Sequence, residues 1–263
     1  MFDYQGKTAL ITGASTGIGA TFARALAARG ANLILVARSE DKLHTLAAEL
    51  SAHQKILTHV IPTDLSQEGA ALTLAQTIQQ QGLYVDILVN NAGFATYGHF
   101  ETLSASRDHA QALLNMVAVV DLTHAFLPPM LERGEGVIIN VASTAGFQPV
   151  PYMAVYGASK AFVLSFSEAL WGEYRKRGIR VLALCPGSTD TPFFKVVGAE
   201  EAKVGGMRTP EQVVATALRA VDQGRSTVVD GVANYLQTMS VRFFPRQVIT
   251  QMSGRFLQPR HTG

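Results

Sequence analysis

The chain has 263 residues, of which 48% are hydrophobic and 16% are charged, and its formal net charge at pH 7 is +2. This composition excludes a disordered chain, and so small a charge without a run of Lys or Arg argues against a nucleic-acid partner. The one cysteine, Cys185, excludes an internal disulfide framework and a cysteine-rich zinc site, and we predict no metal site. The first residues lack the apolar region of a signal peptide, and no apolar stretch approaches the ~20 residues of a membrane helix. We therefore expect a soluble, cytoplasmic protein.

Short apolar runs predict β-strands, and segments of helix length separate most of them. The runs are 8–11, 32–37, 56–61, 86–89, 137–141, 180–184 and 227–229. They are continuous rather than alternating, which is typical of strands buried on both faces. The alternation of strands and helices predicts an α/β protein with a doubly wound Rossmann fold and a mostly or fully parallel seven-stranded sheet. Because no linker or repeat interrupts it, we predict a single domain over residues 1–263 with a helical tail at its C-terminus.

Two segments depart from this alternation. Residues 188–208 carry glycines and charges after the sixth strand, and we predict that they form a mobile lid over the substrate. Thr209 opens the next helix, with Gln212 placed to complete a capping box. Residues 233–258 form an apolar tail with several arginines and no acidic residue, which Pro245 is expected to divide. A tail of this kind most often covers a pocket or a subunit interface, and contact with a membrane surface is the less favoured alternative.

A glycine-rich turn follows the first strand and precedes an amphipathic helix. Glycine lets the backbone approach a dinucleotide pyrophosphate closely, and a helix N-terminus supplies N–H groups and a dipole that favour an anion. The turn residues predicted to bind a cofactor are Gly13, Ser15, Thr16, Gly17, Ile18 and Gly19.

The same turn also matches G-x-S-x-G, the pattern that surrounds the nucleophile of serine hydrolases. In that interpretation Ser15 would be a nucleophile that needs a downstream acid and a histidine. Only one strand precedes the turn, which leaves no earlier loop for the second oxyanion donor. A hydrolase is therefore a distant alternative.

The end of the second strand indicates which dinucleotide binds. An acidic residue at this place would bind the adenosine 2′-hydroxyl of NAD, but Ala37 occupies it and Arg38 follows. A charge-assisted hydrogen bond to a 2′-phosphate contributes about 1.5–3 kcal/mol, or roughly tenfold to a hundredfold in affinity. Arg38 therefore predicts NADP(H). The nearby Glu40 and Asp41 keep NAD(H) as the less favoured alternative.

Tyr156 and Lys160 are four residues apart in a predicted helix and share one face of it. A free phenol has a pKa near ~10, too high for proton transfer at neutral pH. An ammonium ~4 Å away, at an effective dielectric constant of ~20, contributes roughly 4 kcal/mol, or about three pK units. This pair is therefore predicted to give a tyrosine that donates or accepts a proton near pH 7.

Other candidate residues lie at the predicted carboxyl edge of the sheet, where open α/β sheets bind ligands. Ser143 follows the fifth strand, Asn90–Gly93 ends the fourth, and Pro186–Gly187 ends the sixth. Asn115 lies inside the long helix that precedes the fifth strand.

Taken together, these motifs make the chain resemble the short-chain dehydrogenase/reductase superfamily, in its single-domain subgroup, over about residues 6–231. The resemblance implies that Tyr156 is the general acid/base, that Lys160 lowers its pKa and binds the nicotinamide ribose, and that Ser143 holds the substrate oxygen. It also implies that Asn115 orders a water in a proton relay. Members of the superfamily contact adenine at the position of Asp64, the adenosine ribose at that of Asn91, and the nicotinamide carboxamide at that of Thr191. The cofactor-binding residues that the resemblance adds are Asp64, Leu65, Asn91, Ala92, Gly93, Tyr156, Lys160, Pro186, Gly187 and Thr191.

We therefore expect an NADP(H)-dependent oxidoreductase that transfers a hydride between the nicotinamide and a carbonyl or secondary alcohol. A non-catalytic nucleotide-sensing protein on the same fold is the main alternative. By resemblance, the chain is expected to form a homodimer or homotetramer. Candidates for an apolar substrate pocket are Phe94, Phe147, Val150, Tyr152, Met153, Phe193 and Phe194.

Overall fold

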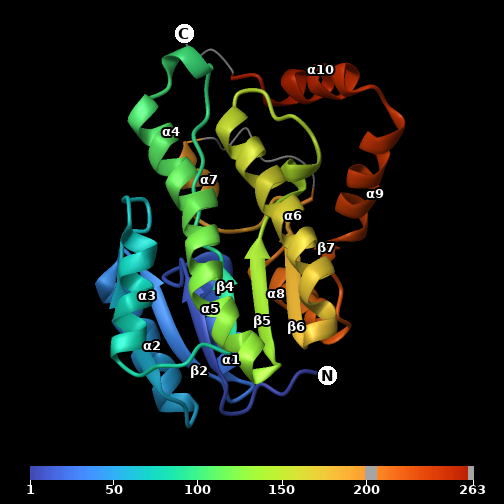
Figure 1. The fold of residues 1–263 in the computed structure, drawn as a ribbon. Coiled ribbons are helices and arrows are strands. Elements are labelled where there is room, and N and C mark those ends of the chain that lie inside the picture. The colour runs from blue at the N-terminus through green and yellow to red at the C-terminus, as the bar shows by residue number, and fades with distance from the viewer. Residues whose placement is uncertain (199–205, 260–263) are drawn as a thin grey trace.

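The computed structural model describes residues 1–198 and 206–259, and its centre is a parallel sheet of seven strands with helices on both faces (Figure 1). The strand order is β3-β2-β1-β4-β5-β6-β7, and every neighbouring pair is parallel. The strands are β1 Thr8–Thr12, β2 Asn32–Ala37, β3 Thr58–Pro62, β4 Ile87–Asn90, β5 Gly136–Val141, β6 Ile179–Cys185 and β7 Thr227–Val229. This architecture confirms the predicted doubly wound Rossmann fold.

The helices connect successive strands, and a helical region closes the chain. The α-helices are α1 Gly17–Ala27, α2 Glu40–His53, α3 Ala70–Gln80, α4 Ala105–Ala112, α5 Ala118–Arg133, α6 Ala154–Tyr174, α7 Phe193–Val197, α8 Pro210–Asp222, α9 Val232–Ser240 and α10 Arg246–Leu257. Short 3₁₀ turns are η1 Phe100–Thr102, η3 Thr144–Phe147, η4 Arg175–Arg177 and η6 Val241–Phe243, and η2 Leu113–Val117 is a π-helical turn. The predicted capping box is present at α8, where Gln212 N donates to the Thr209 hydroxyl and Thr209 N donates to the Gln212 side chain.

Two hydrophobic cores hold the helices against the sheet. On one face, Phe22 and Leu26 of α1 are buried against β1 and β2, and Leu218 of α8 belongs to the same core. On the other face, Phe126 of α5 packs against β4 and β5, and Leu74 of α3 belongs to the same core. Full burial of each large side chain contributes ~1.5–3 kcal/mol, so these cores rather than local propensity fix the helix positions. The two layers leave the carboxyl ends of β1 and β4 free at the point where the strand order reverses, which is where such sheets bind ligands.

One helical run is longer and more apolar than the sequence analysis expected. Among the described residues, Ala105–Arg133 passes the length and hydropathy criteria for a membrane-spanning helix. The expectation that no apolar stretch approaches this length was therefore wrong. In the fold, Leu122, Phe126 and Met130 of this run are buried against the sheet, so its apolar side chains serve the core of the domain.

The two irregular segments meet where Leu257 of α10 shares a hydrophobic cluster with residues of α7. Within 188–208, the backbone pairs Thr189 with Arg208, α7 lies between them, and residues 199–205 fall outside the described residues. Arg208 is anchored by a two-pronged ion pair with the fully buried carboxylate of Asp230, at 2.9 and 3.1 Å. The tail is divided as predicted, because Pro245 separates η6 from α10.

Candidate active site

A cavity of about 520 Å³ opens at the carboxyl edge of the sheet. It extends from the turn after β1, past the ends of β2 and β3, to the first turn of α6. It gathers most of the residues predicted from the sequence. Those that line it are Gly13, Ser15, Thr16, Gly17, Ile18, Arg38, Asp64, Leu65, Asn91, Ala92, Gly93, Ser143, Tyr156, Lys160, Pro186, Gly187 and Thr191. Gly19 and Asn115 do not line it and act from behind its wall.

The glycine turn is shaped by close backbone contacts. Gly13 and Gly17 have φ angles of +66° and +55°, which residues with a side chain rarely adopt. A Cβ on Gly13 would lie 2.8 Å from the side-chain amide nitrogen of Asn91, and a Cβ on Gly19 would clash with the carbonyl oxygen of Gly13. The hydroxyl of Thr16 does not cap α1, so the N–H groups of the first helical turn stay available at the cavity wall. A narrow glycine cradle on an uncapped helix N-terminus fits the pyrophosphate of a dinucleotide.

Asn91 ties this turn to the end of β4. Its side-chain amide donates to the carbonyl of Thr12 at 2.9 Å and to that of Gly13 at 3.3 Å. The Thr12 hydroxyl accepts hydrogen bonds from the N–H groups of Asn91 and Ala92, each at 3.0 Å. These bonds lock the two strand ends that form the floor of the cavity. The structure thus gives Asn91 an architectural role in addition to its place at the predicted ribose position.

Arg38 and Asp64 lie at the adjacent end of the cavity. Arg38 is exposed directly after β2, and no acidic side chain occupies the last position of that strand. Burial alone would raise the pKa of Asp64, but hydrogen bonds from Ser66 and the positive charge of Arg38 outweigh it and lower that pKa. The carboxylate is therefore ionised at neutral pH, and Arg38 presents a cation to the cavity.

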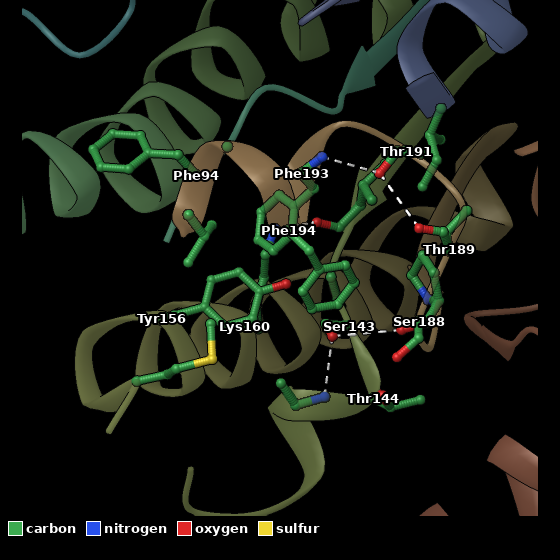
Figure 2. Close-up of a pocket in the computed structure, with 18 of the residues that line it drawn as sticks. Phe94, Ser143, Thr144, Tyr156, Lys160, Ser188, Thr189, Thr191, Phe193 and Phe194 are labelled. Atoms are coloured by element: carbon green, nitrogen blue, oxygen red, sulfur yellow. Dashed lines mark hydrogen bonds between the residues drawn. The ribbon is translucent and has the colours of Figure 1, made fainter. Parts of the chain in front are cut away.

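Tyr156, Lys160 and Ser143 meet at the other end of the cavity (Figure 2). Tyr156 lies in the first turn of α6, where the helix dipole favours a phenolate, and Lys160 follows one turn later. Ser143 reaches them from the end of β5, on the segment that leads into η3. A Cβ on Gly146 would lie 2.7 Å from the carbonyl oxygen of Lys160, so glycine there lets this segment press against α6.

The electrostatics of this trio differ from the simple estimate made from the sequence. The Lys160 ammonium lies 5.7 Å from the centroid of the Tyr156 ring and donates a hydrogen bond to the carbonyl of Val141 at 2.7 Å. Burial raises the pKa of Tyr156, and a hydrogen bond with Ser143 opposes that shift. Burial lowers the pKa of Lys160 to about 8, and its interaction with Cys185 acts in the opposite direction. Desolvation therefore dominates the pKa of both groups in this state.

Asn115 supports the site from the π-helical turn η2. It is 1% exposed, its amide nitrogen donates to the carbonyl of Phe94 at 3.0 Å, and its oxygen accepts from the N–H of Phe94 at 3.2 Å. It also donates to the hydroxyl of Ser159 at 3.1 Å, which in turn donates to the carbonyl of Tyr156 at 2.7 Å. Asn115 thus couples the segment after β4 to the first turn of α6. Its expected role in ordering a water stays a prediction.

Much of the cavity wall comes from α7 and from the tail. Phe193 of α7 lies against Tyr156, with ring centroids 5.6 Å apart. Asn234 of α9 lies close to Gly187, so that a Cβ on Gly187 would be 2.5 Å from the side-chain amide nitrogen of Asn234. From the tail, the lining residues are Asn234, Gln237, Thr238, Ser240, Val241, Ile249, Met252, Ser253, Phe256 and Leu257. Of the apolar candidates named from the sequence, Tyr152 is absent from this lining and packs against His99 instead. The sequence indicated α7 through Phe193 and Phe194 and the tail through its basic, amphipathic pattern, but it did not single out the individual tail residues that line the cavity.

The serine hydrolase alternative finds no support in this geometry. Ser15 lines the cavity at the glycine turn, but no histidine among the described residues lines the same cavity. A serine nucleophile needs a base within hydrogen-bonding reach. Ser15 therefore belongs to the glycine turn.

Comparison with known proteins agrees with the fold and the site. The model of the short chain dehydrogenase family matches residues 7–202, and the chain belongs to this family of oxidoreductases. A very-long-chain 3-oxoacyl-CoA reductase from Anas platyrhynchos is 32% identical over 97% of this chain and 84% of its own length.

Two solved structures are also similar. A short-chain dehydrogenase from Sphingobium yanoikuyae, in complex with NADPH, is 31% identical over 98% of both chains, with a TM-score of 0.81. The bulky-bulky ketone specific alcohol dehydrogenase from Comamonas testosteroni is 30% identical over 98% of this chain and 96% of that chain, with a TM-score of 0.77.

Proposed function

We propose that this protein is an NADP(H)-dependent reductase of bulky, apolar ketones, which also catalyses the reverse oxidation of the alcohols. The observation that carries the proposal is the convergence of Tyr156, Lys160 and Ser143 on one cavity that also contains a glycine cradle and Arg38. The first three residues form an acid–base site, and the others fit an anionic dinucleotide.

The reaction divides between the coenzyme and the chain. When bound, a nicotinamide supplies or accepts the hydride. The hydroxyl groups of Ser143 and Tyr156 hold the carbonyl oxygen of the substrate, and Tyr156 gives its proton to that oxygen as negative charge develops there. Lys160 and the N-terminus of α6 stabilise the resulting phenolate, which then recovers a proton from water. In the oxidation, Tyr156 removes the hydroxyl proton of the alcohol.

The cavity wall supports an apolar substrate. Beside the acid–base site, the wall is made of apolar side chains from three parts of the chain, among them Phe94, Val150, Met153, Phe193 and Phe194. Such a wall favours a hydrocarbon-rich ligand through burial of apolar area. The names of two relatives, a 3-oxoacyl-CoA reductase and an alcohol dehydrogenase for bulky ketones, agree with this class.

A panel of ketones of increasing bulk, assayed by the loss of NADPH absorbance, tests the proposal. We expect turnover of bulky aliphatic or aryl ketones, with kcat/KM rising as apolar surface is added. Coenzyme binding, seen as a change in NADPH fluorescence, without turnover of any ketone or alcohol would instead support a nucleotide sensor.

The preference for NADP(H) is expected to depend on Arg38. Its replacement by aspartate, Arg38→Asp, removes the cation and adds a carboxylate that repels a 2′-phosphate. The ratio of kcat/KM for NADPH to that for NADH is expected to fall by about tenfold to a hundredfold. Steady-state kinetics with both coenzymes measure this ratio.

Arg225→Asp is the matched control for this experiment. It makes the same change of charge on an exposed arginine in the turn before β7, at the opposite edge of the sheet. The control is expected to leave the ratio unchanged. An unchanged ratio in Arg38→Asp would remove Arg38 from the selection of coenzyme.

A further inference from the structure

The corner between α9 and α10 exposes two neighbouring phenylalanines. Figure 1 shows these helices meeting at a bend outside the sheet. Phe243 and Phe244 occupy the bend and are 79% and 53% exposed, and Pro245 follows them directly. Arg242 and Arg246, on either side, are exposed as well. Contact with water is unfavourable for so large an apolar area, which indicates that this corner meets another apolar phase.

The apolar surface continues along α10. Val248, Met252 and Phe256 are spaced by four residues and are 40%, 49% and 71% exposed, so they form a stripe on one side of the helix. The next positions, occupied by Ile249 and Leu257, are buried against the domain. The helix is therefore apolar both on its buried side and on its exposed side.

The charge around this surface has one sign. Arg242, Arg246 and Arg255 are exposed, and no acidic residue lies between Gly231 and Pro259. A two-fold contact between copies of the chain through this surface would bring these arginines together without a carboxylate from the same segment to pair with. An anionic lipid surface offers both negative charges that pair with these arginines and hydrocarbon that covers the exposed apolar side chains.

We propose that the α9–α10 corner docks on anionic membrane surfaces. Phe243 and Phe244 enter the boundary between headgroups and acyl chains, Arg242 and Arg246 pair with lipid phosphates, and the stripe on α10 lies against the lipid. Met252 and Phe256 belong both to this stripe and to the cavity wall. The docked surface therefore adjoins the active-site cavity, and an apolar ligand dissolved in the membrane has a short path into it.

Vesicle co-sedimentation tests the proposal without substrate or coenzyme, so its outcome is independent of the proposed activity. The full-length protein is expected to bind vesicles of phosphatidylcholine with phosphatidylglycerol and to bind vesicles of phosphatidylcholine alone much more weakly. Binding is expected to decrease in high salt, because the Debye length shortens from ~10 Å at 0.1 M to ~3 Å at 1 M. The double variant Phe243→Ser/Phe244→Ser is expected to need at least roughly tenfold more lipid for half-maximal binding.

Tyr84→Ser is the matched control. Tyr84 is 73% exposed but lies just before β4, at the edge of the sheet where the strands begin and away from the cavity. It is expected to bind vesicles as the unmodified protein does. NADPH fluorescence and thermal unfolding verify that each variant is folded, since neither Phe243 nor Phe244 lines the cavity. Failure to bind anionic vesicles, or equal binding by the double variant, overturns the proposal. So does a smaller oligomer in the double variant on gel filtration, which would assign the corner to self-association.

Discussion

Replacement of Tyr156 by phenylalanine is expected to lower kcat for ketone reduction by about 10²–10⁴-fold, the range associated with loss of general acid catalysis. The substitution removes one oxygen from the cavity wall and leaves the ring in contact with Phe193, 5.6 Å between centroids. The fold and the coenzyme cradle are therefore retained, and NADPH is expected to bind with similar affinity. Single-turnover measurement of NADPH oxidation, together with fluorescence titration, separates the two effects.

Tyr152→Phe supplies the control for this loss. It removes the same atom four residues earlier, from a ring that packs against His99 and does not line the cavity. Its kcat is expected to stay close to that of the unmodified protein. If Tyr156→Phe retained most of its turnover, the proton would have to come from another group, and the proposed mechanism would fail.

The sequence predicted most of this site because the relevant residues sit where strands end. Ser143 follows β5 and Gly13 follows β1, and in a parallel sheet these ends share one edge. The strand ends predicted from apolar runs agree with the structure to within two residues. Burial of the strands on both faces explains this agreement, since continuous apolar runs have few other uses in a chain of this size.

The tail shows what local patterns leave out. Its periodicity predicts helices, but the hydrogen bond from the Tyr97 hydroxyl to the carbonyl of Leu257, at 2.9 Å, joins residues 160 positions apart. Contacts of this range depend on the path of the whole chain, which local periodicity does not encode. For the same reason, the pattern alone did not show that Phe243 and Phe256 stay exposed while Ile249 and Leu257 turn inward.

The electrostatics of Tyr156 and Lys160 were harder to predict than their position. Helical spacing fixes the shared face, but it fixes neither the reach of a lysine side chain nor the water it loses. In the structure the ammonium extends past the phenol ring to the carbonyl of Val141. The expected lowering of the tyrosine pKa therefore gives way to a burial effect on both groups.

This burial leads to an expected result for Lys160→Met, which is a gain in stability together with a loss of activity. Methionine has a similar length and no charge to desolvate. The pKa of Lys160 is about 8 in the folded protein against an ordinary value of 10.5, a difference that corresponds to about 3 kcal/mol. Below pH 8 both the folded and unfolded states carry the proton, and the folded state bears the whole cost of burying it. Lys160→Met is therefore expected to unfold several degrees above the unmodified protein at pH 7.

The pH dependence distinguishes this cause from a change in packing. Between pH 8 and 10.5 the unfolded state binds more protons at this site than the folded state does, so the stability of the unmodified protein rises with pH relative to Lys160→Met. The difference in melting temperature is expected to shrink across this range and to vanish near its upper end. Lys176→Met, at an exposed position in η4, is expected to leave the melting temperature unchanged at both ends of this pH range. If Lys160→Met instead melted below the unmodified protein by the same amount at every pH, the expectation would be wrong. That result would show that the hydrogen bond to Val141 outweighs desolvation, and that the lysine carries a full charge at its site in the folded protein.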